Sequence, residues 1–490
     1  MELFLKYPIE VQQELLSDLL QTAKNTEIGK KYRFVELNNY EAFRENVPLR
    51  QYESIEPWID KCRKGVQNVF WPTPIKWFAK SSGTTNAKSK FIPVSEEAIE
   101  HCHMKAGKDM LCMFFNNNPD ADLFSGKALR LGGSSALHES NNTYFGDLSA
   151  IIIENMPFWA DFSSAPSQKV ALMDEWEAKM DAMVKETVNE NITSLVGVPS
   201  WMLVLMNRVL EKTGKKSIAE VWPNLEVYFH GGVSFDPYKE QYEKLIPKKD
   251  FKYYQTYNAS EGFFAIQDRN DASDMLLMLD YGIFYEFIPM NDFNGEDSVA
   301  IPLQEVKLNV NYAIIITTNA GLWRYIIGDT IKFTSLEPYR IKVTGRTKHF
   351  INVFGEELIV ENTEEALKIA CTDTKASIKD YTVAPIFMQG QESGGHEWLI
   401  EFYEPPQDLA LFTKILDDSL KSINSDYEAK RHKNMTLAMP IIHVAKQDLF
   451  YNWLKKSNKL GGQHKIPRLS NARLHLEDML NMNDTQNHVN

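Results

Sequence analysis

The sequence predicts an α/β protein with a large N-terminal α/β domain, whose sheets are flanked by helices and joined by a β-rich part, and a smaller mobile C-terminal α/β domain. Up to residue 262, apolar runs that end in glycine or hydroxyl-rich loops alternate with amphipathic helical stretches, which favours a substantially parallel sheet. Residues 275–333 consist of strand-like runs separated by turn residues. Helix and strand patterns alternate again after residue 345. We therefore expect a large domain over 1–345, a hinge over 346–348 and a small lid domain over 349–490.

The elements of the large domain follow from local patterns. Apolar residues at helical spacing predict an opening helix over 9–27. Ser95 and the two glutamates after it suit a helix N-terminus, so a helix is expected over 95–116. Further helices are expected over 169–189 and 201–212. Strands are expected on both sides of the loop 81–90 and in the runs ALRL, ITSLVG, LEVYFH and FKYYQTY.

In the small domain, the same patterns predict helices over 361–372 and 409–423. Strands are expected near residues 381, 397 and 440. This order again describes an α/β unit, with about 140 residues, which is a normal domain size.

Composition excludes several classes of protein. The 490 residues contain 53 Lys and Arg against 66 Asp and Glu, a net charge of -13, and the cations are scattered, which disfavours binding to nucleic acid. The four cysteines form no CxxC pair and are typical of reduced cytosolic thiols. The N-terminal stretch lacks the features of a signal peptide, and the apolar runs fall short of the ~20 residues needed to cross a bilayer. We expect a cytoplasmic monomer with no nucleic-acid or membrane partner.

The loop SSGTTNAKSK at 81–90 is the segment best suited to chemistry. Its small hydroxyl side chains and main-chain N–H groups can surround a polyphosphate, and its lysines can neutralise the charge. It is not a P-loop, because Ala87 stands where GxxxxGK[ST] requires glycine before Lys88. The alternative is an ordinary Ser/Thr hairpin.

Three further loops carry residues of interest. Tyr257–Gly262 follows a strand and offers an aromatic ring for a flat base and a carboxylate for Mg²⁺. The segment 323–329 ends in Asp329, which suits ribose hydroxyls; the alternative is a turn salt bridge between Arg324 and Asp329. The loop 461–468 presents cations between glycines, and its alternative is a solvated basic loop.

These motifs occur in the order found in adenylate-forming enzymes. The whole chain resembles a bacterial-type member of the Gretchen Hagen (auxin-responsive promoter) family of acyl-acid amido synthetases, within the acyl-CoA synthetase and luciferase-like superfamily. SSGTTNAKSK resembles the first nucleotide motif of that family, YNASEG the second, YIIGD the third and GQHKIPR a C-terminal element. GRTK at 345–348 resembles the superfamily hinge.

The resemblance implies roles for individual residues. The hydroxyl loop would hold the phosphates of ATP, the two glycines of FHGG would line adenine with Tyr257 stacked on it, Asp329 would hold the ribose, and Arg346 would contact a phosphate. The implied cofactor-binding residues are Ser81, Ser82, Gly83, Thr84, Thr85, Lys90, Gly231, Gly232, Tyr257, Asn258, Ala259, Ser260, Asp329 and Arg346. The implied catalytic residues are Glu261, which would bind Mg²⁺, and Lys465, which would swing in from the small domain.

The expected activity follows from the same resemblance. ATP and Mg²⁺ would activate a small carboxylic acid to an acyl-adenylate, and the acyl group would pass to an amino acid. Two alternatives stay open: an acyl-CoA ligase that shares the adenylation step, and a nucleotide-binding or interaction protein without turnover.

Overall fold

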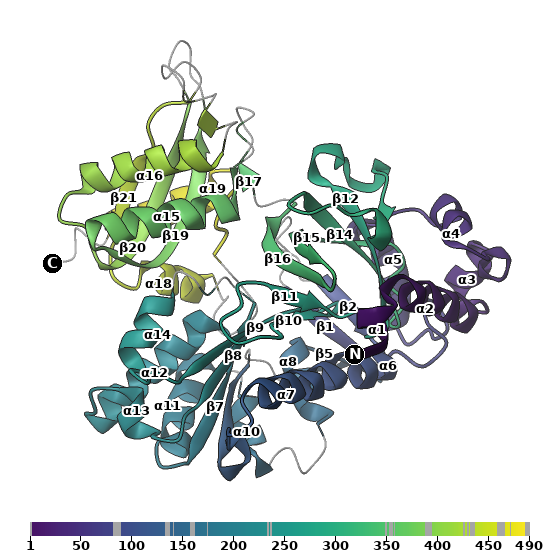
Figure 1. Ribbon diagram of the computed structural model, residues 1–490, viewed down its shortest axis with the longest axis horizontal. Helices are drawn as coiled ribbons and strands as arrows, with labels where there is room; N and C mark the ends of the chain where they lie inside the picture. The colour runs from purple at the N-terminus through teal and green to yellow at the C-terminus, as the bar shows by residue number, and fades with distance from the viewer. Residues whose placement is uncertain are drawn as a thin grey trace. The chain divides into compact units, whose positions relative to one another are not determined.

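The computed structural model describes most of the chain. The described residues are 2–81, 90–132, 138–140, 142–156, 162–173, 175–232, 235, 238–347, 350–351, 356, 358–387, 394–424, 427–428, 431, 437–457, 466–470 and 472–485. They form two units: the first comprises the described residues within 2–232 and 242–343, and the second those within 235–241, 344–457 and 466–485. The long N-terminal part of the chain leaves the first unit between Val343 and Thr344. Mixed α/β architecture confirms the expected fold class (Figure 1).

The described part of the first unit contains a 12-stranded sheet and a 4-stranded sheet. In spatial order, the large sheet consists of β13 (Ile301–Pro302), β12 (Ile283–Pro289), β14 (Asn311–Thr318), β15 (Tyr325–Leu336), β16 (Tyr339–Arg346), β11 (Met275–Leu277), β10 (Gly262–Ile266), β9 (Lys252–Ala259), β8 (Val227–Gly231), β7 (Ile192–Gly197), β3 (Lys127–Leu131) and β6 (Ser164–Ala165). The small sheet has the order β2 (Lys90–Val94), β1 (Trp77–Ser81), β5 (Thr143–Gly146) and β4 (His138–Ser140).

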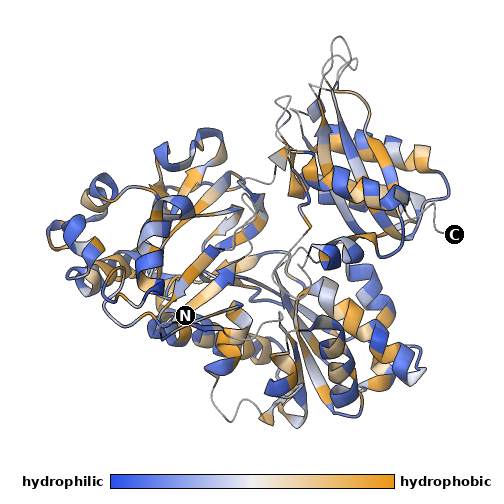
Figure 2. Ribbon diagram, turned by 180° about the vertical axis from the view of Figure 1, so that it is seen from behind, coloured by the Kyte–Doolittle hydropathy of each residue, from blue (hydrophilic) through white to orange (hydrophobic). Residues whose placement is uncertain are grey.

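The large sheet has a parallel and an antiparallel part. Strands β6, β3, β7, β8 and β9 pair in parallel, as the alternation of strands and helices predicts. The β-rich stretch forms the antiparallel part, where β14 lies between β12 and β15. The antiparallel part is deeply buried: seven of the eight residues of β14 are buried. Figure 2 shows hydrophobic residues concentrated along the strands, while the helices show mixed colours.

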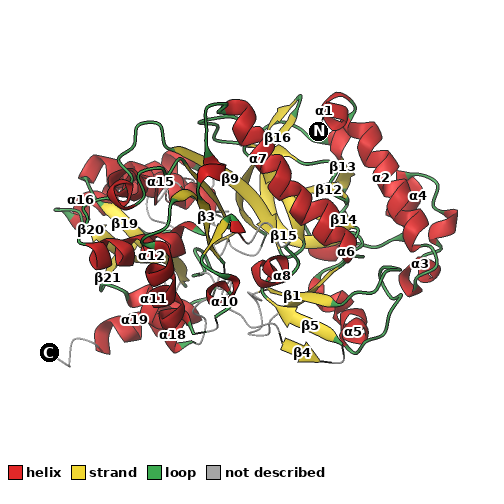
Figure 3. Ribbon diagram, turned by 90° about the horizontal axis from the view of Figure 1, so that it is seen from below, coloured by secondary structure: helices red, strands yellow, loops and turns green. Residues whose placement is uncertain are grey.

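Helices cover both faces of the parallel strands. Figures 1 and 3 show α11 and α12 on one side of these strands and α7 on the other. The helices of this unit are α1 (Glu2–Lys6), α2 (Pro8–Ala23), α3 (Glu27–Lys31), α4 (Tyr40–Asn46), α5 (Tyr52–Arg63), α6 (Glu96–Ala98), a π-helical turn (Ile99–Met104), α7 (Lys105–Asn117), α8 (Leu148–Glu154), α10 (Gln168–Ala171), α11 (Trp176–Thr187), α12 (Pro199–Thr213) and α13 (Ile218–Val221); α14 (Lys239–Leu245) begins in residues of the second unit.

Two helix predictions need comment. The helix expected over 95–116 is present, and the Ser95 side chain caps it by accepting a hydrogen bond from the main-chain N–H of Ala98 (2.9 Å). The single helix expected over 169–189 is wrong, because α10 ends at Ala171 and α11 begins at Trp176. The carboxylate of Glu175 accepts hydrogen bonds from two main-chain N–H groups and so starts the second helix anew.

The second unit is a three-stranded sheet with helices on both faces. Its strands are β19 (Ser377–Ile386), β20 (Gly395–Glu404) and β21 (Ile441–Ala445), beside a short pair of β17 (Phe350–Ile351) and β18 (Leu358–Ile359). Its helices are α15 (Val360–Thr374), α16 (Leu409–Ile423), α18 (Leu449–Lys456) and α19 (Leu474–Thr485). Because strand side chains alternate, Trp398 and Ile400 of β20 pack with α15 and α16, whereas Leu399 packs with α18 and α19.

Candidate functional site

Two predicted site residues from distant parts of the sequence meet in the first unit. Tyr257 lies near the end of β9 and Asp329 lies in β15. The hydroxyl of Tyr257 donates a hydrogen bond to Oδ2 of Asp329 at 2.8 Å, and both residues are buried. The Tyr257 ring packs on Phe264, with 4.9 Å between the ring centroids. The tyrosine therefore orients the carboxylate, and the second and third motifs belong to one place.

Gly231, from the segment FHGG, lies on the strand next to β9. It ends β8 and pairs with Thr256 of the parallel strand β9. A Cβ atom at Gly231 would lie 2.7 Å from the carbonyl oxygen of Thr256 and 3.2 Å from Oδ1 of Asn258, so only glycine fits this close approach. The next residue, Gly232, has φ of 82°, in the left-handed region that glycine adopts without strain.

Glu261 lies in the turn between β9 and β10. Gly262 pairs with Ala259 across this turn, Ser260 is buried and the Glu261 side chain is half-buried. Asn258, Ala259, Ser260 and Glu261 therefore lie beyond the Tyr257–Asp329 contact along one hairpin. A single carboxylate at such a turn is a suitable oxygen ligand for a Mg²⁺ ion whose other ligands are phosphate oxygens and water.

The loop predicted to hold phosphates begins and ends on paired strands. Ser81 and Lys90 are partners in the antiparallel pair of β1 and β2, which confirms the strand, loop, strand interpretation. The ammonium of Lys90 lies 5.4 Å from the centre of the Tyr52 ring, and the Tyr52 hydroxyl accepts the main-chain N–H of Phe91 at 2.9 Å. Ser82, Gly83, Thr84 and Thr85 lie outside the described residues, and so does Lys465.

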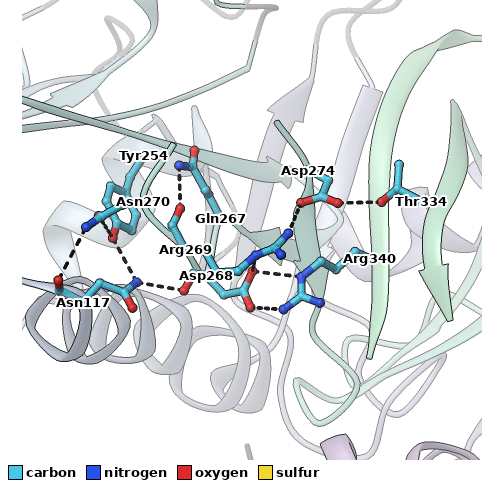
Figure 4. Close-up of polar contacts among 9 residues, drawn as sticks. All are labelled: Asn117, Tyr254, Gln267, Asp268, Arg269, Asn270, Asp274, Thr334 and Arg340. Carbon is cyan, nitrogen blue, oxygen red and sulfur yellow. Dashed lines mark hydrogen bonds and ion pairs between the residues drawn. The ribbon is translucent and has the colours of Figure 1, made fainter. Parts of the chain in front are cut away.

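Arg346, the remaining predicted contact, is the last residue of β16 and is half-buried in the second unit. The strand that leads to it is anchored within the first unit by a polar cluster (Figure 4). Arg340 of β16 pairs with Asp268, and Thr334 of β15 donates to Oδ2 of Asp274 at 2.8 Å. Both aspartates belong to the loop between β10 and β11, so this loop clamps two neighbouring strands.

Arg324 has a structural role. Its guanidinium makes two hydrogen bonds to Glu286, at 2.9 and 2.8 Å, and donates to two main-chain carbonyls of the N-terminal helical region. The turn salt bridge with Asp329, considered from the sequence, is therefore not the ion pair that Arg324 makes. The side chains of Arg324 and Glu286 are 4% and 1% exposed, so a buried ion pair ties the N-terminal helices to the antiparallel strands.

Sequence reasoning missed Asp147, a buried acid next to the strand pair β1 and β5. It directly follows β5, which runs parallel to β1. Burial raises the pKa of Asp147 to about 7, against the lowering effect of the Lys80 and Lys179 charges. Lys179, itself buried, donates to the carbonyl of Gly132 at 3.3 Å. The signal was present in the sequence TYFGD, another strand that ends in glycine and an acid.

His230, which the sequence left without a role, lies directly before the two glycines. Burial lowers its pKa to about 3, so the imidazole is neutral near pH 7 and is a weak general base there.

Among the described residues, no group of three or more His, Cys, Asp and Glu side chains is placed to hold a metal ion. Within the same part of the chain, no helix combines the length and apolar composition that a membrane span requires.

Three family models match the chain in order. The model of the GH3 family N-terminal domain matches residues 1–251, that of the GH3 family central domain 276–346, and that of the GH3 family C-terminal domain 361–474. Among curated proteins, the jasmonoyl–L-amino acid synthetase JAR6 of Nicotiana attenuata is 24% identical over 546 residues, covering 94% of this chain and 90% of the relative.

Solved structures share the fold. The AtGH3.15 acyl acid amido synthetase in complex with 2,4-DB superposes with a TM-score of 0.79 at 17% identity, covering 97% of this chain and 93% of that one. A 2-hydroxyisobutyryl-CoA ligase in the postadenylation state superposes with a TM-score of 0.60 at 12% identity, covering 97% and 91%. At these identities the likeness shows the fold alone.

Proposed function

Because the chain belongs to the GH3 family, we propose that it is an acyl-acid amido synthetase: a ligase that uses ATP to activate a carboxylic acid as an acyl-adenylate and then joins the acyl group to an amino acid. A free carboxylate is a poor electrophile, whereas an acyl-adenylate carries AMP as a good leaving group. The observation that carries the proposal is the contact between Tyr257 and Asp329, which joins the second and third nucleotide motifs in one buried site.

In this proposal each residue binds or positions a part of ATP. Gly231 and Gly232 line the adenine with Tyr257, and Asp329 accepts hydrogen bonds from the ribose. The loop from Ser81 to Lys90 surrounds the phosphates. Glu261 supplies the carboxylate for a Mg²⁺ ion, which when bound neutralises phosphate charge. These roles are positional and electrostatic, as nucleotidyl transfer requires.

We further propose how the domains divide this work. The large domain, 1–345, binds ATP and the acid; 346–348 forms the hinge; and the small domain, 349–490, is a mobile lid. Arg346 contacts a phosphate, and Lys465 enters the site for the first half-reaction only. The match of a separate C-terminal domain model to 361–474 supports this division.

Proposed partners are therefore a small carboxylic acid and an amino acid, with no nucleic acid and no membrane. We propose a monomer in the cytoplasm, in keeping with four cysteines that are all free thiols and scattered cations.

The identity of the product tests the function. The protein is incubated with ATP, Mg²⁺ and a panel of indole, benzoate and fatty acids, together with either an amino-acid pool or coenzyme A, and the products are identified by mass spectrometry. We expect amides and AMP. Thioesters alone would replace the amide proposal by a CoA ligase, and ATP binding without any acid-dependent pyrophosphate exchange would indicate a protein without turnover.

The contact between Tyr257 and Asp329 gives a prediction about ATP. Asp329→Ala should raise the KM for ATP about tenfold to a hundredfold, because hydrogen bonds to a charged group contribute about 1.5–3 kcal/mol. Tyr257→Phe, which removes only the hydroxyl that orients the carboxylate, should raise it about threefold to tenfold. Both KM values, for ATP and for the acid, are measured by pyrophosphate exchange.

Tyr254→Phe is the matched control for this prediction. Tyr254 is buried on the same strand, but its hydroxyl contacts Asn270 at 2.6 Å in the polar cluster of Figure 4. Removal of the Tyr254 hydroxyl should leave the KM for ATP unchanged. An equal rise in the KM for the acid in the Tyr257 and Asp329 variants would contradict a role in holding the nucleotide.

A further inference from the structure

A buried thiol binds the main chain directly after the Glu261 turn. Cys102 lies in the π-helical turn 99–104 and is 1% exposed. Its Sγ accepts a hydrogen bond from the main-chain N–H of Phe263 at 3.2 Å and lies 3.8 Å from the carbonyl oxygen of the same residue, to which the S–H donates. Burial raises the pKa of Cys102 to about 12, so the group stays a thiol at neutral pH and keeps this proton.

The thiol meets the sheet where the strand pairing is irregular. Phe263 pairs with Asn258, but Ala265 pairs with Tyr257, so the register of β9 and β10 shifts between Phe263 and Ala265. At such a bulge the sheet holds the main chain less regularly. One side chain here satisfies both main-chain groups of Phe263, two residues after Glu261, and so constrains the end of the turn that presents the carboxylate.

The helical stretch that carries Cys102 also begins directly after β2. It starts after β2, and its first residue, Ser95, donates from Oγ to the carbonyl of Asn319 at 2.8 Å in the connection between β14 and β15. A π-helical turn contains an extra residue and re-aims the side chains around it. Through the main chain and these two side chains, one helical stretch links β2, the turn 260–262 and the strand pair that contains Asp329.

We propose that Cys102 is a positioning residue that sets the Glu261 carboxylate for a Mg²⁺ ion bound with ATP. This inference rests on the proposed function of the nucleotide site. The thiol would act through the main chain of Phe263 and not by contact with the metal or the nucleotide.

The test measures binding and not turnover. ATP affinity is measured by calorimetry at a series of Mg²⁺ concentrations for the wild type, Cys102→Ala and Cys102→Ser. We expect Cys102→Ala to raise the Mg²⁺ concentration for half-maximal ATP binding about threefold to tenfold, the range expected when one modest hydrogen bond is lost. Cys102→Ser, whose hydroxyl retains a donor and an acceptor, should give a smaller rise.

Two further variants separate positioning from simple loss of stability. Cys62→Ala is the matched control, because Cys62 is also a buried free thiol, 2% exposed, but lies in α5. It should lower the melting temperature to a similar extent with no change in Mg²⁺ dependence. In a Glu261→Gln background, Cys102→Ala should cause no further rise in the Mg²⁺ concentration for half-maximal ATP binding, because both changes act on the same carboxylate.

The outcomes are distinct. If Cys102→Ala behaves like Cys62→Ala, or if its effect is fully additive with Glu261→Gln, Cys102 has no positioning role. If Cys102→Ala does not fold, the comparison of Cys102→Ser with the wild type decides, and an unchanged Mg²⁺ dependence overturns the inference. If ATP binding by the wild type does not depend on Mg²⁺, the proposed role of Glu261 is wrong. If the wild type does not bind ATP at all, the proposed function of the site is wrong.

Discussion

Lys465→Ala is expected to slow acid-dependent pyrophosphate exchange by about a hundredfold or more, while the affinity for ATP and the melting temperature stay close to those of the wild type. A positive charge at the phosphate where negative charge develops can lower the barrier by a few kcal/mol, and about 1.4 kcal/mol corresponds to tenfold in rate. The proposed rotation of the small domain removes Lys465 from the site after adenylation, so the variant should still convert supplied acyl-adenylate to amide.

Lys456→Ala is the control for this experiment. Lys456 belongs to the same C-terminal region, its side chain is 62% exposed at the end of α18, and its loss should change neither half-reaction. Normal pyrophosphate exchange by Lys465→Ala would return Lys465 to the alternative of a solvated loop cation. An equal loss of both half-reactions would contradict the proposed rotation.

Arg324→Met is expected to destabilise the first unit by about 3–5 kcal/mol, because it leaves the carboxylate of Glu286 buried without its cationic partner. That carboxylate is 1% exposed and cannot regain water in the folded state. The free energy of unfolding is measured by urea denaturation, followed by tryptophan fluorescence. ATP binding by the folded protein should change little, since Arg324 contacts the N-terminal helical region and not the nucleotide motifs.

Two variants control this measurement. Lys61→Met breaks an ion pair with Glu27 whose side chains are 48% and 43% exposed, and exposed pairs contribute about 0–1 kcal/mol. Glu286→Gln in the Arg324→Met background should recover part of the loss, because it removes the buried charge while keeping the side-chain volume. A loss no larger than that of Lys61→Met would show that Glu286 finds another partner.

Local patterns in the sequence were sufficient to predict most helices and strands of both units. The helix expected over 409–423 has the bounds of α16, and the strands on both sides of the loop 81–90 are β1 and β2. These predictions succeed because apolar periodicity and a capping residue such as Ser95 act within a few residues. The order of the motifs indicated the family, and the family models confirm it.

Local patterns failed in two places, for different reasons. The helix expected over 169–189 is interrupted by a local signal that apolar periodicity does not show, because the carboxylate of Glu175 caps a new helix there. The partner of Arg324 is Glu286, 38 residues away in sequence, and not the nearby Asp329. No periodicity in a sequence records such pairing, since it depends on how strands are ordered in the sheet.

The sequence by itself determined the fold class, most of the helices and strands, and the residue types available for binding a nucleotide. The tertiary structure decided which of them meet: Tyr257 and Asp329 are 72 residues apart, and Cys102 and Phe263 are 161 apart, yet each pair shares a hydrogen bond. The physical reason is that short-range propensities act along the chain, whereas the contacts that orient a carboxylate form across a sheet whose strand order is set by burial of the whole apolar core.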